Sequence, residues 1–148
     1  MTTFSINKRA HFDYEILEKY EAGLVLAGHE VKSIKTGHVS LKESFVTIHG
    51  EELYLTNAHI PPYKHAGKIA DYDPTRPRKL LLKKSEIKHL IGQARTKGLT
   101  LVPIRMYTKR RLLKLEFGLG KGKKEYDKRN KIKKREDEKG MRRMMKNL

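Results

Sequence analysis

The side chains that could carry out acid–base chemistry or bind a metal in this chain are seven histidines and scattered carboxylates. The histidines form no HExxH motif and no pair four residues apart, so a surface role for each is favoured over metal ligation. The candidate acids show no spacing that predicts a shared cleft; they are Glu21, Glu30, Glu43, Asp71 and Asp73. The absence of cysteine excludes thiol nucleophiles, disulfides and thiolate zinc sites. We therefore expect no catalytic site, no metal and no cofactor.

Two cations beside two aromatic rings form the first candidate for binding a nucleic acid. The segment 7–14, NKRAHFDY, places Lys8 and Arg9 near Phe12 and Tyr14. Cations neutralise phosphates and aromatic rings stack on unpaired bases, so the combination favours binding of RNA or single-stranded DNA. The alternative is that the two rings enter the core, and for Tyr14 neither interpretation is preferred.

A second candidate is the run of cations that ends a proline-rich stretch. Residues 73–79, DPTRPRK, carry Arg76, Arg78 and Lys79 on a backbone stiffened by two prolines. A stiff loop loses less conformational entropy when its cations bind phosphates. We expect these three cations to be presented to a polyanion, and a solvated charge run is the alternative.

The last 28 residues are the most charged part of the chain. Residues 121–148 hold 13 Lys or Arg and five Asp or Glu, a net charge of +8, which leaves +9 for residues 1–120. Self-repulsion and the scarcity of apolar residues predict a tail that is disordered when the protein is free. The tail is rich in good helix formers, so a neutralising polyanion should make it helical. On that helix one face would carry Lys124, Lys128, Lys131 and Arg135.

Composition also narrows the choice of partner and compartment. A basic body and a basic tail predict a polyanionic partner that touches both, with a membrane surface as the second choice. No apolar run approaches the roughly 20 residues that span a bilayer, and Met1–Ala10 lacks the apolar region of a secretory signal. We expect a soluble, cytoplasmic protein that binds no membrane.

The elements that position these side chains follow from the spacing of apolar residues. Alternation with a period of two over 14–26 predicts one or two strands with a turn near 21–23. Glycines bracket 28–37 and predict a short helix that ends at Gly37. Two β-rich runs within 44–57 predict a hairpin.

A loop, a helix and a second hairpin are expected in the rest of the body. Four of the five prolines fall within 61–78, which predicts a long loop. A helix should follow, with Ser85 as its N-cap and Gly98 as its end. Strands are expected at 99–107 and 112–119, joined by a basic turn.

About six short strands and a few short helices indicate a mainly β (α+β) fold. An antiparallel barrel would remove most exposed strand edges, and an OB-like barrel is the specific expectation, by analogy with other nucleic-acid-binding domains. The alternation stops after Leu119. We therefore predict an OB-like RNA-binding barrel over 1–120 and a basic C-terminal tail over 121–148.

Five segments resemble a known family. They are NKRA at 7–10, EAGLVLAGHEVKSIKTG at 21–37, DPTRPRKLLL at 73–82, KGLTLVP at 97–103 and GLGKGKKEYDKR at 118–129. In this order, spread over nearly the whole chain, they are similar to the SsrA-binding protein (small protein B) family. The resemblance implies an OB-like barrel that binds the tRNA-like domain of transfer-messenger RNA (tmRNA). It also implies a tail that enters the decoding centre and the empty mRNA channel of a stalled ribosome.

The resemblance further implies roles for single residues. Asn7, Glu21 and Leu81 stand where family members contact the tRNA-like domain, and the same motifs contain Lys8, Arg9, Tyr14, Arg76 and Lys79. Two departures are Gly120, where alanine is common, and Tyr126, where histidine often occurs; Tyr126 can still stack on a base. The tail residues expected at the decoding centre (16S rRNA) and in the mRNA channel are Lys121, Lys123, Lys124, Tyr126, Asp127, Lys128, Arg129, Lys131, Ile132, Lys133, Lys134 and Arg135.

The resulting hypothesis is ribosome rescue by trans-translation. The protein would deliver tmRNA to stalled ribosomes, with an indirect association with alanyl-tRNA and elongation factor Tu. Folding of the tail inside an empty channel would replace codon–anticodon pairing as the signal that the ribosome has stalled. A general structural RNA-binding protein or RNA chaperone of the ribosome is the main alternative. An RNA-processing enzyme is less favoured, because no acid pair, metal cluster or nucleophile is visible.

Overall fold

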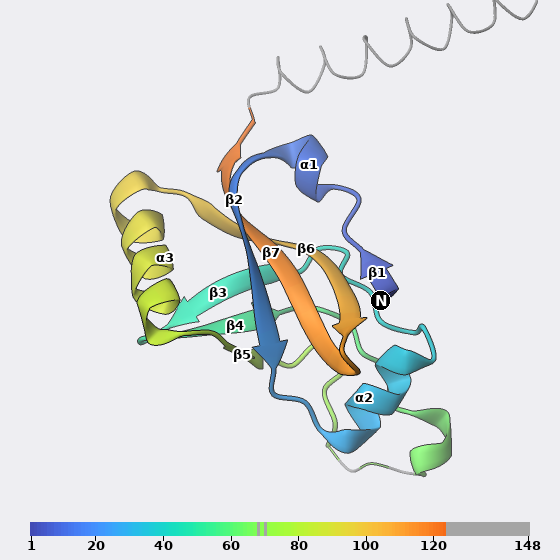
Figure 1. Cartoon of the computed structure of the whole chain (residues 1–148). Coiled ribbons are helices and arrows are strands. Elements are labelled where there is room, and N and C mark those ends of the chain that lie inside the picture. The colour runs from blue at the N-terminus through green and yellow to red at the C-terminus, as the bar shows by residue number, and fades with distance from the viewer. Residues whose placement is uncertain (68, 70, 124–148) are drawn as a thin grey trace, which may run out of the picture.

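The computed structural model describes residues 1–67, 69 and 71–123. Within them seven strands form one antiparallel sheet in the order β1-β6-β7-β2-β5-β4-β3, with three α-helices and a 3₁₀ helix around it (Figure 1). In chain order the elements are β1 (Thr2–Ile6), α1 (Ala10–Asp13), β2 (Tyr14–Leu24), α2 (Gly28–Lys35), β3 (Phe45–His49), β4 (Glu52–Thr56), η1 (Lys64–Ala66), β5 (Arg78–Leu81), α3 (Lys84–Lys97), β6 (Thr100–Lys109) and β7 (Leu112–Gly122).

Strand β2 is a single continuous strand, so the predicted turn near residues 21–23 is wrong. Ala22 and Gly23 both pair with β7, and Gly23 also pairs with Leu81 of β5. The glycine that suggested a turn marks a close approach instead. A Cβ atom at Gly23 would lie only 3.4 Å from the Cβ atom of Leu81, whose side chain occupies that space.

The β6–β7 hairpin is longer than predicted. Its turn consists of Arg110 and Arg111 alone, with φ angles of 51° and 68°, as in a two-residue type I′ turn. Strand β7 continues three residues beyond its predicted end at Leu119, because Lys121 and Gly122 still pair with the start of β2. The sheet therefore carries the chain to the edge of the basic tail.

The sheet curls until β3, at one end, contacts β6 near the other. In the part of the chain that the structure describes, β1 and β3 do not pair with each other. The backbone N–H of Leu41 instead donates to Ser5 Oγ at 3.3 Å. OB folds are partly open barrels of this kind. The predicted mainly β, OB-like fold is confirmed, with seven strands in place of about six.

Helices α2 and α3 and the first hairpin lie close to where the sequence predicts them. Helix α2 is followed by Gly37 at φ 82°, and β3 and β4 form the expected hairpin. The predicted N-cap Ser85 is wrong, because α3 begins at Lys84 and its N-cap is Lys83, two residues before Ser85. The carboxylate of Glu86 accepts from the N–H of Lys83 at 3.3 Å, and Gly98 ends the helix at φ 62°.

Two clusters of buried apolar side chains hold these elements together. The main cluster packs Ile34 of α2 and Leu90 of α3 against sheet residues such as Phe117. A smaller one, formed by Ala10, Val102 and Ile104, seats α1 on β6. No helix in the described residues is both long and apolar enough to cross a membrane.

Candidate RNA-binding surface

Asn7 fixes the turn between β1 and α1. Its side-chain amide donates to the carbonyl of Pro103 at 2.9 Å, and its Oδ1 accepts from the N–H of Arg9 at 3.3 Å. These bonds tie the turn to β6 and leave Lys8 and Arg9 exposed. Among the described residues, Lys8 has no ion-pair partner. Asn7 therefore holds the scaffold that presents two cations.

Arg9 combines a surface ion pair with a ring contact. Its Nη2 atom lies 3.1 Å from Asp13 Oδ1, and its guanidinium sits 4.6 Å from the centroid of Phe12. The Arg9 side chain is 66% exposed, and exposed pairs of this kind contribute little to stability. The guanidinium can exchange Asp13 for a phosphate while it keeps the ring contact.

The start of the basic tail lies beside the same helix. Lys123 donates its backbone N–H to the carbonyl of Asp13 at 2.9 Å, and its Nζ to the carbonyl of His11 at 2.7 Å. Lys121 is exposed opposite Glu15 in the β2–β7 ladder. Of the predicted tail residues, Lys123 thus lies against α1, which directly follows Lys8 and Arg9 in the chain, and Lys121 is exposed on β7. The other ten lie outside the described residues: Lys124, Tyr126, Asp127, Lys128, Arg129, Lys131, Ile132, Lys133, Lys134 and Arg135.

Tyr14 lies at the boundary between the core and the surface. It is half-buried and packs on the small cluster that seats α1. A Cβ atom at Gly120 would lie 3.1 Å from the Cβ atom of Tyr14, so the glycine gives the tyrosine room.

The proline-rich loop is anchored by a buried carboxylate on α2. Glu30 is fully buried and receives hydrogen bonds from the N–H of Ala27 at 2.9 Å, from Nε of Arg78 at 2.9 Å and from the guanidinium of Arg76. Burial raises the pKa of Glu30, but these bonds outweigh burial and lower the pKa to about 2. The Glu30 carboxylate therefore stays charged. It holds Arg76 of the loop and Arg78 at the start of β5 in place.

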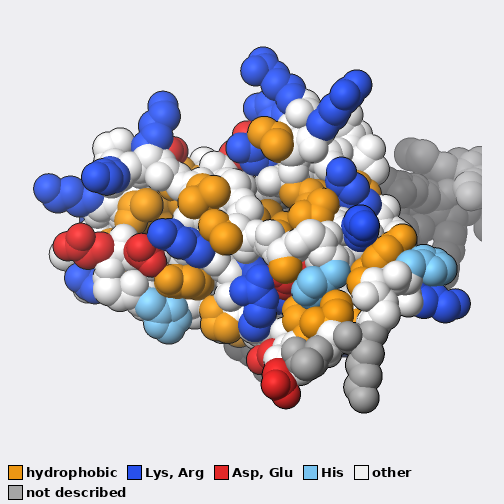
Figure 2. Space-filling model, turned by 90° about the horizontal axis from the view of Figure 1, so that it is seen from below, with side chains coloured by type: hydrophobic (Ala, Val, Ile, Leu, Met, Phe, Trp, Pro, Cys, Tyr) orange, Lys and Arg blue, Asp and Glu red, His pale blue; other side chains and the backbone are white. Residues whose placement is uncertain are grey.

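The sequence predicted that Arg78 would be one of the cations presented to a polyanion. This prediction is wrong. Arg78 is fully buried and also donates to the carbonyls of Ala58, at 2.7 Å, and Pro74, at 2.9 Å. Arg76 keeps part of its guanidinium side chain at the surface, 37% exposed. Lys79 pairs with Glu52 at 3.0 Å on the outside of the sheet and is 42% exposed. Figure 2 shows the face below the loop and α2, where Lys and Arg side chains surround hydrophobic ones.

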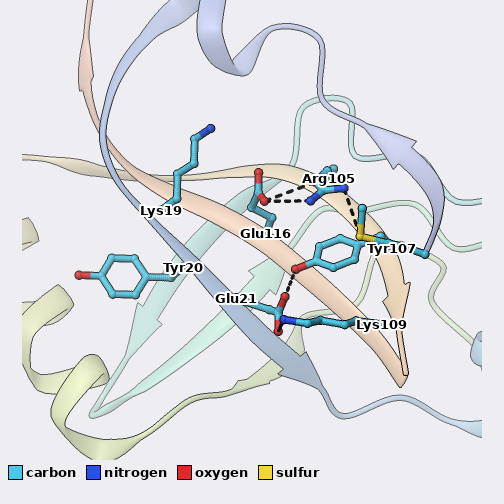
Figure 3. A pocket seen from close by; sticks show the side chains of 8 residues that line it. Lys19, Tyr20, Glu21, Arg105, Tyr107, Lys109 and Glu116 are labelled. Atoms are coloured by element: carbon cyan, nitrogen blue, oxygen red, sulfur yellow. Dashed lines mark hydrogen bonds and ion pairs between the residues drawn. The ribbon is translucent and has the colours of Figure 1, made fainter. Parts of the chain in front are cut away.

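Glu21 lies in an open pocket of about 480 Å³ on the outer face of β2, β7 and β6 (Figure 3). It accepts a hydrogen bond from the hydroxyl of Tyr107 and lies 3.6 Å from Nζ of Lys109. The Tyr107 hydrogen bond, followed by the nearby lysines, lowers the pKa of Glu21 although burial opposes it. Burial and the Glu21 carboxylate raise the pKa of Tyr107. Glu21 is thus a fixed anion that can accept hydrogen bonds from RNA hydroxyl or amino groups.

Strand pairing brings Leu81 next to Glu21 although 60 residues separate them in the sequence. Leu81 lies across Gly23, two residues from Glu21 and therefore on the same face of β2. Its side chain is 51% exposed. The pair offers an apolar surface beside a carboxylate, a combination that suits the sugar face and hydroxyls of RNA.

The predicted residues thus form separate groups. Asn7, Lys8, Arg9 and Tyr14 gather at the α1 end, where the tail begins, whereas Arg76 lies in the loop near α2 at the opposite end (Figure 1). Glu21 and Leu81 lie on β2 and β5, with Lys79 at the start of β5.

Sequence reasoning missed three residues of the Glu21 pocket. Arg105, Tyr107 and Lys109 line it from β6, with the guanidinium of Arg105 4.2 Å from the centroid of Tyr107. Arg105 and Tyr107 stand two residues apart in the strand predicted over 99–107, and this spacing is the signal that could have found them, whereas Lys109 falls in the predicted turn. Among the described residues, no three histidine or acidic side chains converge as a metal ion would require.

Comparison with known proteins identifies the family of this chain. The family model described as "SmpB protein" matches residues 4–147. The chain belongs to the SmpB family. The family prediction drawn from the five sequence motifs is therefore confirmed.

Individual relatives match nearly end to end. The SsrA-binding protein of Acaryochloris marina (strain MBIC 11017) is 50% identical over 142 residues, which cover 96% of this chain and 92% of the relative. The SsrA-binding protein of Carboxydothermus hydrogenoformans is 53% identical over 130 residues, which cover 88% of this chain and 87% of the relative. A solved structure described as "tmRNA-SmpB: a journey to the center of the bacterial ribosome" superposes with a TM-score of 0.66. The two chains are 50% identical in sequence, and the superposed region covers 81% of this chain and 84% of the chain in the solved structure.

Proposed function

We propose that this SmpB-family protein binds the tRNA-like domain of tmRNA and delivers it to stalled ribosomes for trans-translation. The observation that carries the proposal is the 50% identity to an SsrA-binding protein over 142 residues, because SsrA binding is what that relative's name states. The solved structure of tmRNA–SmpB on the bacterial ribosome supports the ribosome as second partner. The protein acts by binding, not as an enzyme, and works in the cytoplasm.

The body holds the RNA through two kinds of contact. Lys8, Arg9 and Arg76 neutralise phosphates, and Tyr14 stacks against a base or sugar. Glu21 and Leu81 recognise the sugar and base edges of the tRNA-like domain. The exposed positions of Lys8 and Arg9 and the fixed anionic state of Glu21 support these roles. Lys79 exchanges its surface pair with Glu52 for a phosphate.

The basic tail reads the state of the ribosome. It enters the decoding centre and empty mRNA channel, becomes helical there and is excluded sterically when mRNA fills the channel. Its charge of +8 and the hydrogen bonds of Lys123 to α1, which follows Lys8 and Arg9 in the chain, support a path from the bound RNA into the ribosome. Alanyl-tRNA and elongation factor Tu associate indirectly, through tmRNA.

Two measurements test the proposal. Purified protein should bind tmRNA far more tightly than an unrelated tRNA in a competition filter assay. Equal competition would favour a general RNA-binding protein or RNA chaperone. The role of the tail is tested by comparing the full chain with a chain that ends at Lys123. The shortened chain keeps all of β7 and the hydrogen bonds of Lys123 to α1. The shortened protein should still bind tmRNA but lose peptide tagging on stalled ribosomes, and retained tagging would refute the role of the tail.

A further inference from the structure

A small pocket between the end of α2 and η1 has the composition of a nucleobase site. It has a volume of about 250 Å³ and is lined by Thr36 and His38 after α2 and by Pro61, Pro62, Tyr63 and His65 around η1. We propose that this pocket, the Tyr63 pocket, holds one unpaired base of the RNA partner. The inference rests on the proposed RNA-binding function and adds a contact at the end of the molecule remote from α1 (Figure 1).

Aromatic rings and proline rings form the apolar lining of the pocket. Tyr63 and His65 pack edge to face, with centroids 5.5 Å apart and an interplanar angle of 69°. Nζ of Lys32 lies 5.9 Å from the Tyr63 centroid. Bases stack on tyrosine and histidine rings regardless of sequence. Lys32 has a flexible stem, so it can move from the ring to the phosphate of the stacked nucleotide.

The pocket is held open without a ligand. The hydroxyl of Ser33, a side chain only 1% exposed, donates to the carbonyl of Pro61 at 2.7 Å and joins the loop to α2. The carbonyl of Tyr63 accepts from the N–H of Ala66 at 3.0 Å and sets the turn of η1. A site that is already ordered loses little entropy when a base enters it.

The hydrogen bonds of Thr36 assign the tautomer of His38. The Thr36 hydroxyl lies 2.7 Å from the carbonyl of Ser33, which can only accept, so the hydroxyl proton points there. Nδ1 of His38 lies 2.8 Å from the same Thr36 oxygen and must therefore donate to it. In the neutral ring Nε2 is then an acceptor, and it has no hydrogen-bond partner among the described residues. An amino or imino N–H at the edge of a base is the matching donor.

Charge and size favour a nucleotide over other small ligands. Lys32 and Lys64 are exposed at the pocket and have no ion-pair partner within the described ranges, and no acidic residue lines it. The volume lies below the range of about 300 to 1,000 Å³ that drug-sized ligands need, but one planar base fits. Where η1 lies, hydrophobic, histidine and lysine side chains stand together at the surface (Figure 2).

The test uses the full-length protein and a five-nucleotide single-stranded RNA with 2-aminopurine at its centre. Stacking on Tyr63 should quench the fluorescence of 2-aminopurine in a saturable way. Tyr63→Phe, which keeps the ring, should behave like the unmodified protein, whereas Tyr63→Ala should weaken the quenching titration at least about fivefold. Phe45→Ala is the matched control, because Phe45 is a 46% exposed ring on β3 outside the pocket.

A second pair of variants keeps the test independent of the folding of Tyr63→Ala. Lys64→Ala should weaken the titration, whereas Lys88→Ala, an equal loss of charge on the exposed face of α3, should not. Circular dichroism checks the fold of each variant. The inference is overturned if the probe is not quenched by the unmodified protein, or if Tyr63→Ala and Lys64→Ala match their controls. Binding to intact tmRNA, measured in parallel, separates this outcome from failure of the proposed function, in which tmRNA itself is not preferred.

Discussion

Glu30 and Arg78 form an ion pair inside the protein, with Arg78 Nη2 2.7 Å from Glu30 Oε2 and both side chains fully buried. The pair links α2 to the first residue of β5 across 48 positions of sequence. Tyr72 joins it, with its hydroxyl 3.1 Å from Glu30 and 2.7 Å from the carbonyl of Ile60. This cluster anchors residues 72–78 of the proline-rich loop, and with them Arg76.

Replacement of Glu30 by glutamine should destabilise the protein strongly. Glu30→Gln leaves the buried guanidinium of Arg78 without its counter-charge, and loss of one partner of a buried pair costs about 3 to 5 kcal/mol. Urea unfolding followed by circular dichroism measures the loss. Glu52→Gln, which removes the partly exposed pair with Lys79, is the control and should change the free energy of unfolding much less. Similar losses in both variants would contradict a special role for the buried cluster.

The same carboxylate should make stability depend on acid pH. The folded-state pKa of Glu30, about 2, lies below its ordinary value of 4.5, so the unfolded chain binds the proton more readily. Its stabilisation, about 3 kcal/mol in all, is complete above pH 4.5 and is lost as the pH falls towards 2. Urea titrations between pH 5 and pH 2 should show a shallower decline in Glu30→Gln than in the unmodified protein. Parallel declines would show that other carboxylates account for the pH dependence.

Three glycines along β7 should differ in their tolerance of alanine. A Cβ atom at Gly118 would lie 2.6 Å from Ile16 Cγ2 and 3.2 Å from the backbone oxygen of Glu18, whereas at Gly122 it would meet nothing within 4 Å. Gly118→Ala should cost about 1 to 3 kcal/mol by overpacking. Gly120→Ala, with its Cβ 3.1 Å from the Cβ of Tyr14, should cost less, and Gly122→Ala should be close to neutral. Thermal or urea unfolding of the series checks this order, and a destabilised Gly122→Ala would show that contact distance is not the cause.

Lys8 should contribute to RNA binding but not to folding. It is exposed and has no ion pair among the described residues, so Lys8→Ala should leave the melting temperature unchanged. Loss of one phosphate contact should reduce the slope of log affinity against log salt by about 1. Filter binding to tmRNA over a salt series measures the slope. Lys42→Ala, an exposed cation in the segment before β3, is the control and should keep the original slope.

Leu81 should matter for RNA affinity more than for stability. Its side chain is 51% exposed beside Glu21, and Leu112, 61% exposed at the start of β7, is the matched control. Leu81→Ala should weaken tmRNA binding, while Leu112→Ala should not, and both should unfold at nearly the same urea concentration as the unmodified protein. Equal affinities for the two variants would remove Leu81 from the RNA contact.

The positions of the candidate RNA-binding residues could be predicted only in part. Alternating apolar residues predicted β2, because a half-buried strand repeats every two residues, and two β-rich runs within 44–57 predicted the hairpin of β3 and β4. The role of Arg78 could not be predicted, because a buried arginine and a phosphate-binding arginine look identical until the carboxylate that neutralises one of them is located. The pocket of Glu21 was missed for a related reason, since it depends on residues from three strands that only the sheet brings side by side.

The sequence by itself determined the family, the mainly β class and the charge of body and tail, because these follow from motifs, periodicity and composition that are properties of the chain in order. The tertiary structure alone decided which cations are free and which are neutralised. It placed Leu81 across Gly23 beside Glu21, Arg78 on Glu30 and Lys123 on α1, through pairings between residues 48 to 112 positions apart. Such long-range contacts depend on sheet register and packing, and the spacing of residues along the sequence does not predict them.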